Sequence, residues 1–298
     1  MNPKGSDSMT TRTQTHLRSV KKTKRRNTIL YHIIVSIISF AMLYPLLWMF
    51  ASSLKPTNEI FVSVSSLIPY NATLDNYITG WRGFAGLSFG VFFKNSLFVA
   101  FVHSLGCTVS AAVAAFGFAR LKFPGRNFWF VCMILTMMLP GQVMMIPRYI
   151  LFNKMGWVGT FLPMTVPAFF GNAFNIFLVM QFIRGIPRDM DEAARIDGCS
   201  WYGIFGYIIL PLIIPALVTV SVLSFINSWG DFMGSLLYLN TPTKYTVAYA
   251  LKLFSDTSFT DYGATFAMSV LSMVPILIIF FLFQKNLVEG ISMQGIKG

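Results

Sequence analysis

The side chains that could do chemistry gather in residues 184–203, the most highly charged stretch after the first 28 residues. Its carboxylates belong to Asp189, Asp191, Glu192 and Asp197, and three arginines accompany them. Clustered carboxylates can bind a metal ion or act as acid and base in an enzyme. These acids share one short segment that contains no histidine and has no second carboxylate pair near it, which argues against a membrane-embedded enzyme.

Local signals in this segment predict a short helix over residues 190–198. Pro187 precedes it, Asp189 can accept a hydrogen bond from a first-turn amide, and Glu192 completes a capping-box pattern. Gly198 can adopt the left-handed conformation that ends a helix. A loop that only reverses the chain is the alternative, but such a loop does not need about 20 residues with a capped helix.

Uncharged polar residues form a second group of candidates. Asn172 and Asn175 are three residues apart, and so are Ser224 and Asn227, which places each pair on one face of a helix. Amides and hydroxyls can replace water around an uncharged polar solute, so these four residues are candidates to line a pathway. Hydrogen bonding between neighbouring helices is the alternative role.

The composition of the chain indicates which class of protein structure holds these residues in place. The 298 residues are 55% hydrophobic and 11% charged, with a formal charge of +12 and a mean hydropathy of +0.62. A disordered chain is excluded, and a soluble enzyme is not favoured because its surface needs about twice as much charge. The three cysteines form no CxxC pair and indicate neither a disulfide framework nor a metal site.

Six apolar segments are each long enough to cross about 30 Å of hydrocarbon. They lie near residues 29–51, 95–119, 127–147, 159–183, 204–230 and 264–284, and none contains Asp, Glu, Lys or Arg. We therefore predict an all-α integral membrane protein with six transmembrane helices in one domain, 29–298. An ion-coupled carrier is not favoured because such helices normally contain a buried charge. His32 and His103 are interpreted as packed, hydrogen-bonded residues.

The basic residues indicate orientation. Residues 1–28 carry eight Lys and Arg against one acid, Asp7, and we expect this tail to be disordered. Attraction to anionic lipid explains it better than nucleic-acid binding, because it runs directly into an apolar segment. With the N-terminus inside, the inner segments hold sixteen Lys and Arg and the outer segments seven. Both termini are therefore expected in the cytoplasm.

The spacing of the charged segment resembles a known signature. The EAA motif of membrane subunits of binding-protein-dependent ABC importers is matched, with its proper spacing, at Glu192, Ala193, Ala194, Gly198, Ile208, Leu210 and Pro211. Further stretches, at 43–48, 73–77 and 284–298, resemble the carbohydrate-uptake branch, specifically its maltose-type second permease subunit. The resemblance covers the chain from about residue 30 onward.

The resemblance implies that the 190–198 helix is a cytoplasmic coupling helix between spans four and five. Its contacts with a cytoplasmic ATPase would involve Asp191, Glu192, Ala193, Ala194, Arg195, Asp197 and Gly198. Implied partners are a second, related permease subunit, two ATPase subunits and an extracytoplasmic sugar-binding protein, at a bacterial inner membrane. No cofactor is expected on this chain, and ATP with Mg²⁺ would be bound by the partner, because no Gly-Lys pair for a P-loop occurs. A secondary transporter or channel that needs no ATPase is the alternative function.

Overall fold

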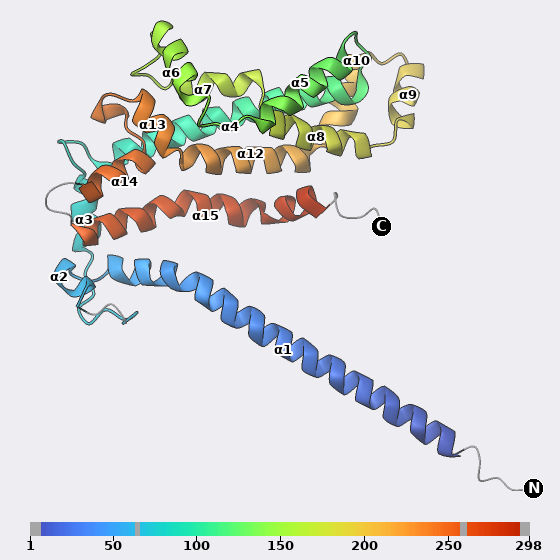
Figure 1. Cartoon of the computed structure of the whole chain (residues 1–298), viewed down its shortest axis with the longest axis horizontal. Helices are drawn as coiled ribbons and strands as arrows, with labels where there is room; N and C mark the ends of the chain where they lie inside the picture. Colours follow the sequence, from blue (N-terminus) through green and yellow to red (C-terminus); the bar gives the residue numbers. More distant parts are fainter. Residues whose placement is uncertain (1–6, 63–65, 257–260, 293–298) are drawn as a thin grey trace, which may run out of the picture.

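A computed structural model describes the backbone of residues 7–62, 66–256 and 261–292, with side chains for 27–62, 66–254 and 261–286. The described chain is helical and contains no strand, only an isolated bridge between Phe84 and Leu87 (Figure 1). The longer elements are α1 (Asp7–Ser53), α4 (Phe89–Arg120), α5 (Arg126–Met138), α6 (Met145–Lys154), α8 (Ala173–Gly185), α12 (Ile214–Trp229), α14 (Val247–Asp256) and α15 (Tyr262–Ser292). The shorter ones are α2 (Thr57–Ile60), α3 (Asp75–Arg82), α7 (Leu162–Thr165), η1 (Val166–Phe170), α9 (Asp189–Ile196), α10 (Trp201–Gly203), η2 (Ile204–Ile209), α11 (Leu210–Leu212), α13 (Phe232–Tyr238) and η3 (Pro242–Lys244).

Most of the predicted apolar segments are found as long helices. Within the described residues, four stretches are long and apolar enough to cross a membrane, namely Asn27–Ser53, Phe89–Arg120, Leu162–Gly185 and Tyr262–Asn286. A fifth candidate consists of Trp201–Leu212 and Ile214–Trp229, which meet at an angle of 73°. Pro211 and Pro215 flank this bend, where each proline removes a backbone donor. The predicted all-helical fold with several helices of membrane-spanning length is therefore confirmed.

The third predicted segment, 127–147, is not one helix. α5 ends at Met138, and α6 begins only at Met145. Pro140 and Gly141 lie in the gap, where proline cannot continue the hydrogen-bond ladder and glycine favours a turn. At 13 residues, α5 alone is shorter than the roughly 20 residues that a span needs.

The N-terminal tail also differs from expectation. We expected 1–28 to be disordered, but α1 begins at Asp7. No glycine or proline occurs between Asp7 and Tyr44, so the helix of the first apolar segment can extend backward through the basic stretch.

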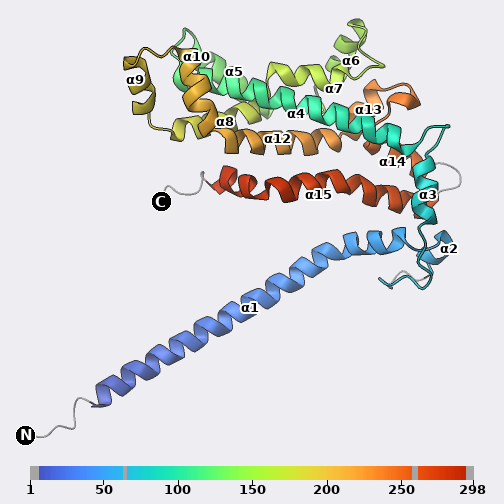
Figure 2. The same cartoon turned by 180° about the vertical axis from the view of Figure 1, so that it is seen from behind.

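α4 is the central helix of the bundle, and α8, η1 and α12 pack against it (Figures 1 and 2). Ala111, Ala115 and Ala119 are buried at intervals of four residues and belong to one core cluster with Val179 and Ile183 of α8. Such small side chains let two helix backbones approach closely. α1 instead extends away from the bundle and exposes apolar side chains (Figure 1). In the most apolar stretch of this span, no residue is buried by the rest of the described chain.

Candidate functional site

α9 lies beyond one end of the bundle, between α8 and α10, as the charged segment predicted (Figure 1). It ends as expected: Gly198 has a φ of +81°, its amide bonds to the Arg195 carbonyl, and the Cys199 amide bonds to the Ala194 carbonyl. This pair of bonds is a Schellman motif. Apart from Gly198 and its two chain neighbours, no atom of the described residues lies within 4 Å of the position that a Cβ on Gly198 would occupy, so the backbone conformation alone calls for glycine there.

The predicted capping box at the start of α9 is wrong. The N-cap residue is Arg188, and no side chain caps the helix. Arg188 already has helical dihedral angles, whereas a side-chain cap requires an extended residue at that position. The backbone carbonyl of Arg188 instead accepts from the amides of Asp191 and Glu192 at 2.9 and 3.1 Å.

A buried ion pair fixes α9 to the bundle. The Nε of Arg120, the last residue of α4, lies 2.9 Å from Oδ2 of Asp191, and the two side chains are 2% and 7% exposed. The Nη2 of Arg120 donates to the Ile186 carbonyl at 2.8 Å, so the same guanidinium also holds the segment that leads into α9. Burial raises the pKa of the Asp191 carboxyl, and the Arg120 charge partly offsets that rise.

This pair changes the interpretation of Asp191. The family resemblance implies that Asp191 contacts an ATPase, but the side chain of Asp191 faces its own chain. Arg120 was missed as a site residue. A signal was available, because it is the first cation after a long uncharged segment, where an unpaired charge would be costly.

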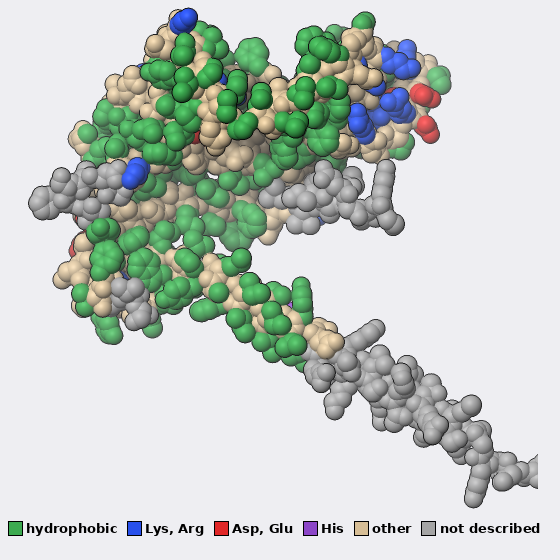
Figure 3. Space-filling model, in the orientation of Figure 1, with side chains coloured by type: hydrophobic (Ala, Val, Ile, Leu, Met, Phe, Trp, Pro, Cys, Tyr) green, Lys and Arg blue, Asp and Glu red, His purple; other side chains and the backbone are tan. Residues whose placement is uncertain are grey.

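The opposite side of α9 is open to a partner. Glu192, Ala193, Arg195 and Asp197 are exposed, and Ile196 is 87% exposed. Ala194 is half-buried and packs against the main core cluster, so α9 has an inner and an outer side. Figure 3 shows charged side chains gathered at this end of the molecule, in contrast to the largely apolar surface elsewhere in that view. A short exposed helix with small, apolar and charged side chains can fit into a groove of another protein.

The four residues predicted as candidates to line a pathway have different environments in the structure. Asn175 and Ser224 are buried and bond to each other, with Asn175 Nδ2 donating to Ser224 Oγ at 3.1 Å. This contact between α8 and α12 is the packing role that was the alternative. Asn172 caps α8 by accepting from the Asn175 amide at 3.2 Å and also lines a cavity, while Asn227 is exposed on α12. Whether any of the four lines a pathway remains a prediction.

His103 is hydrogen-bonded, as interpreted from the sequence. Its Nδ1 lies 2.8 Å from the Met164 carbonyl, in the helical stretch that Pro163 and Pro167 interrupt. Ser110 Oγ of α4 similarly donates to the Ala168 carbonyl at 2.9 Å. These bonds satisfy carbonyls beside a broken helix, which bilayer lipid cannot do. Among the residues with described side chains, no group of three or more His, Cys, Asp or Glu could hold a metal ion.

Comparison with known proteins gives a consistent result. Residues 106–293 match the family described as binding-protein-dependent transport system inner membrane component. The arabinooligosaccharides transport system permease protein AraQ of Halalkalibacterium halodurans is 32% identical, over 88% of this chain and 93% of that protein. The galactooligosaccharides transport system permease protein GanQ of Bacillus subtilis is 30% identical, over 90% of this chain and 94% of that protein. A chain of a bacterial ABC transporter involved in the import of the acidic polysaccharide alginate has the same fold, with a TM-score of 0.75 at 21% identity, covering 88% of this chain and 97% of that one.

Proposed function

Because the chain belongs to the family of binding-protein-dependent transport system inner membrane components, we propose that it is the permease subunit of an ATP-driven importer for a sugar or oligosaccharide. The named relatives support the substrate class, since their names give arabinooligosaccharides, galactooligosaccharides and diacetylchitobiose as substrates of their transport systems. The chain forms one half of the translocation pathway and hydrolyses no ATP itself.

The observation that carries this proposal is the construction of α9. Its inner side is fixed to α4 by the Arg120–Asp191 pair and to the core by Ala194, while its outer side is exposed. A groove on a cytoplasmic ATPase that closes around the outer side would displace α9, and the inner contacts would pass that displacement to α4. Glu192 and Ala193 are the residues we assign to the joint.

The remaining partners follow from the same assignment. A second, related permease subunit completes the pathway and covers apolar side chains of α1, such as Ile37, which is 64% exposed. Two cytoplasmic ATPase subunits bind ATP and Mg²⁺, and an extracytoplasmic binding protein delivers the sugar. The chain crosses a bacterial inner membrane six times with both termini inside, α5 and α6 together making the third crossing and the bent pair at 73° the fifth.

Co-purification from native membranes tests the proposal. A tagged chain, extracted gently, should bring with it a second permease-like chain and a P-loop ATPase, both identifiable by mass spectrometry. Glu192→Lys should lose the ATPase and keep the second permease, because it reverses a charge on the outer side of α9. Asp75→Lys, the same reversal at an exposed position on α3, is the matched control and should retain both. A chain that is recovered alone and transports without ATP would make the protein a secondary transporter.

A further inference from the structure

A cavity of about 410 Å³ lies between α4, α6, the α7–η1 stretch and α13. This volume is within the range of small-ligand sites. His103, near the middle of α4, is on its wall, and α6 and α13 lie toward the end of the bundle opposite α9 (Figures 1 and 2). The cavity is therefore in the half of the bundle that faces away from the proposed ATPase.

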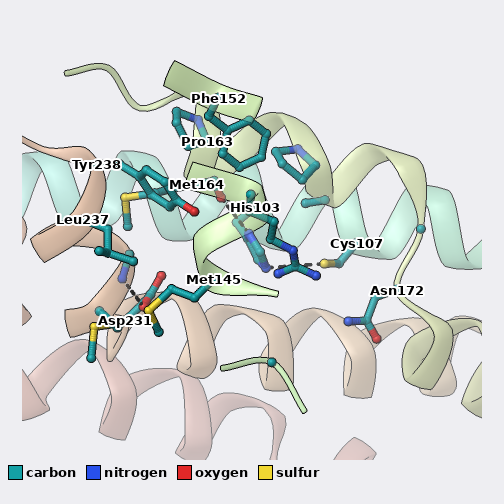
Figure 4. A pocket seen from close by; sticks show the side chains of 17 residues that line it. His103, Cys107, Met145, Phe152, Pro163, Met164, Asn172, Asp231, Leu237 and Tyr238 are labelled. Carbon is teal, nitrogen blue, oxygen red and sulfur yellow. Dashed lines mark hydrogen bonds between the residues drawn. The ribbon is translucent and has the colours of Figure 1, made fainter. Parts of the chain in front are cut away.

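Three side chains on its wall have unused hydrogen-bonding groups. Asp231 caps α13 with Oδ1, which accepts from the Gly234 amide at 2.8 Å, and its Oδ2 has no partner within the described chain. The hydroxyl of Tyr238 makes no hydrogen bond to the described residues, although the residue is only 8% exposed. Asn172 uses Oδ1 as a cap and leaves its Nδ2 free. Figure 4 shows Tyr238 and Asp231 on one side of the cavity and Asn172 on the other, with His103 between them.

Asn172 is exposed and Asp231 is half-buried, and neither the free Oδ2 of Asp231 nor the hydroxyl of Tyr238 is shut off from solvent. These groups can therefore hydrogen-bond to a solute that enters the cavity. Ionisable residues within a membrane protein also mark substrate pathways. His103 has no such spare capacity, because both ring nitrogens already have partners. The free groups thus include an acceptor at Asp231, a donor at Asn172 and a hydroxyl at Tyr238 that can do either.

This combination fits the chemistry of an uncharged sugar. A sugar ring offers hydroxyls that donate to a carboxylate and accept from an amide, and its C–H faces can pack on aromatic rings such as Phe152 and Tyr238 on the cavity wall. Arg148 also lines the cavity and balances the charge of Asp231, so the wall has no net charge to select an acidic ligand. We infer that this cavity holds one uncharged sugar unit of the substrate while the substrate crosses the membrane. This inference rests on the proposed function.

Three substitutions remove the free groups and preserve the packing. Tyr238→Phe removes only the hydroxyl. Asp231→Asn keeps an Oδ1 that can cap α13, and Asn172→Ser keeps an oxygen that can cap α8. Tyr149→Phe is the matched control, because Tyr149 stacks on Tyr238 but is not on the cavity wall.

The whole transporter, reconstituted in proteoliposomes with its binding protein, is tested with arabino-, galacto- and maltooligosaccharides, diacetylchitobiose and trehalose. The measured quantity is the number of sugar molecules transported per ATP hydrolysed, for a sugar that the wild-type transporter moves. We expect this ratio to fall about fivefold in Tyr238→Phe and in Asn172→Ser. We expect a fall of about tenfold or more in Asp231→Asn, since a charged acceptor is lost. ATP hydrolysis stimulated by the binding protein should stay within twofold of wild type, and Tyr149→Phe should match wild type.

Normal transport per ATP in all three variants would overturn the cavity assignment and leave the proposed function intact. A wild-type transporter that moves none of these sugars would overturn the proposed substrate class and the sugar occupancy together. Equal losses of transport and ATP hydrolysis would also overturn the assignment, because they would indicate damage to the fold and not to sugar contact.

Discussion

Arg120 and Asp191 form the contact on which the position of α9 depends. Their two side chains are nearly inaccessible, and Oδ1 of Asp191 is buried without a hydrogen-bond partner among the described residues. A buried ion pair adds little net stability relative to apolar residues of similar volume, but removal of one partner leaves a buried charge and costs about 3–5 kcal/mol. The pair therefore serves to fix a position more than to stabilise the fold.

The first prediction concerns this pair. Arg120→Met and Asp191→Leu should each lower the unfolding temperature in detergent and abolish uptake, because each leaves one unpaired buried charge. In the double variant no charge is buried, so most of the loss in unfolding temperature should be reversed. A smaller share of the loss in sugar uptake should be reversed. Thermal unfolding of the purified complex and sugar uptake in cells measure the two effects. Full recovery of uptake in the double variant would show that the ion pair has no positioning role.

The sequence indicated part of this site. Gly198 could be assigned correctly because a helix end has strong local requirements that one residue satisfies. Arg120 could not be paired with Asp191 from the sequence, because the contact depends on how α4 and α9 meet in space. The predicted cap at Asp189 was wrong because Arg188, just before it, already has helical dihedral angles, which the residue types alone do not reveal.

At the scale of elements, α4 owes its central place to its small residues. Ala115 is fully buried in the cluster that joins α4 to α8 and to the bent fifth segment, whereas Val113, on the same helix, is 58% exposed. The seam between these helices is closely packed, so it has little room for a larger side chain.

The second prediction follows from this packing. Ala115→Leu should destabilise the bundle by about 1–3 kcal/mol through overpacking. Val113→Leu adds one methylene on an exposed face and should have little effect. Thermal unfolding of the two variants in the same detergent measures the difference. Equal unfolding temperatures would mean that α4 and α8 are not closely packed at Ala115.

Hydrophobic segments were predictable as elements, but their continuity was not. Each of the six apolar segments contains helix in the structure, because length and apolarity fix that property locally. The prolines in these segments indicate that some helices are kinked. They do not indicate which helices break, because prolines also lie in continuous helices such as α1 and α15. Whether a proline bends or breaks a helix depends on neighbours that satisfy the freed carbonyls, as His103 does for Met164.

At the scale of the whole molecule, the two ends of the bundle differ in chemistry. Arg184, Arg188 and Arg195, in or beside α9, are exposed. Figure 3 shows Lys and Arg side chains gathered at this end of the molecule. The other end carries α6 and α13, beside the cavity. Under the positive-inside rule, the proposed orientation has the arginine-rich end in the cytoplasm.

The third prediction tests this orientation. In a chain whose natural cysteines Cys107, Cys132 and Cys199 are replaced by alanine, single cysteines are placed at the exposed positions Ile196 and Asn240. A membrane-impermeant maleimide should label Asn240→Cys in spheroplasts and Ile196→Cys only after the membrane is opened. The reverse pattern would invert the orientation and exclude α9 as the contact to a cytoplasmic ATPase.

The ion pair between Arg120 and Asp191 also has a consequence for biosynthesis. The two residues are separated by about 70 residues, so at roughly 5–20 residues per second the ribosome adds Asp191 several seconds after Arg120. During that interval the Asp191 carboxylate does not yet exist, and in the proposed orientation Arg120 is one of the cations that the positive-inside rule places on the cytoplasmic side. Once α9 emerges, the same guanidinium becomes an internal counter-ion. In the proposed orientation, one arginine would thus favour the insertion of its helix first and hold the finished loop to that helix afterwards.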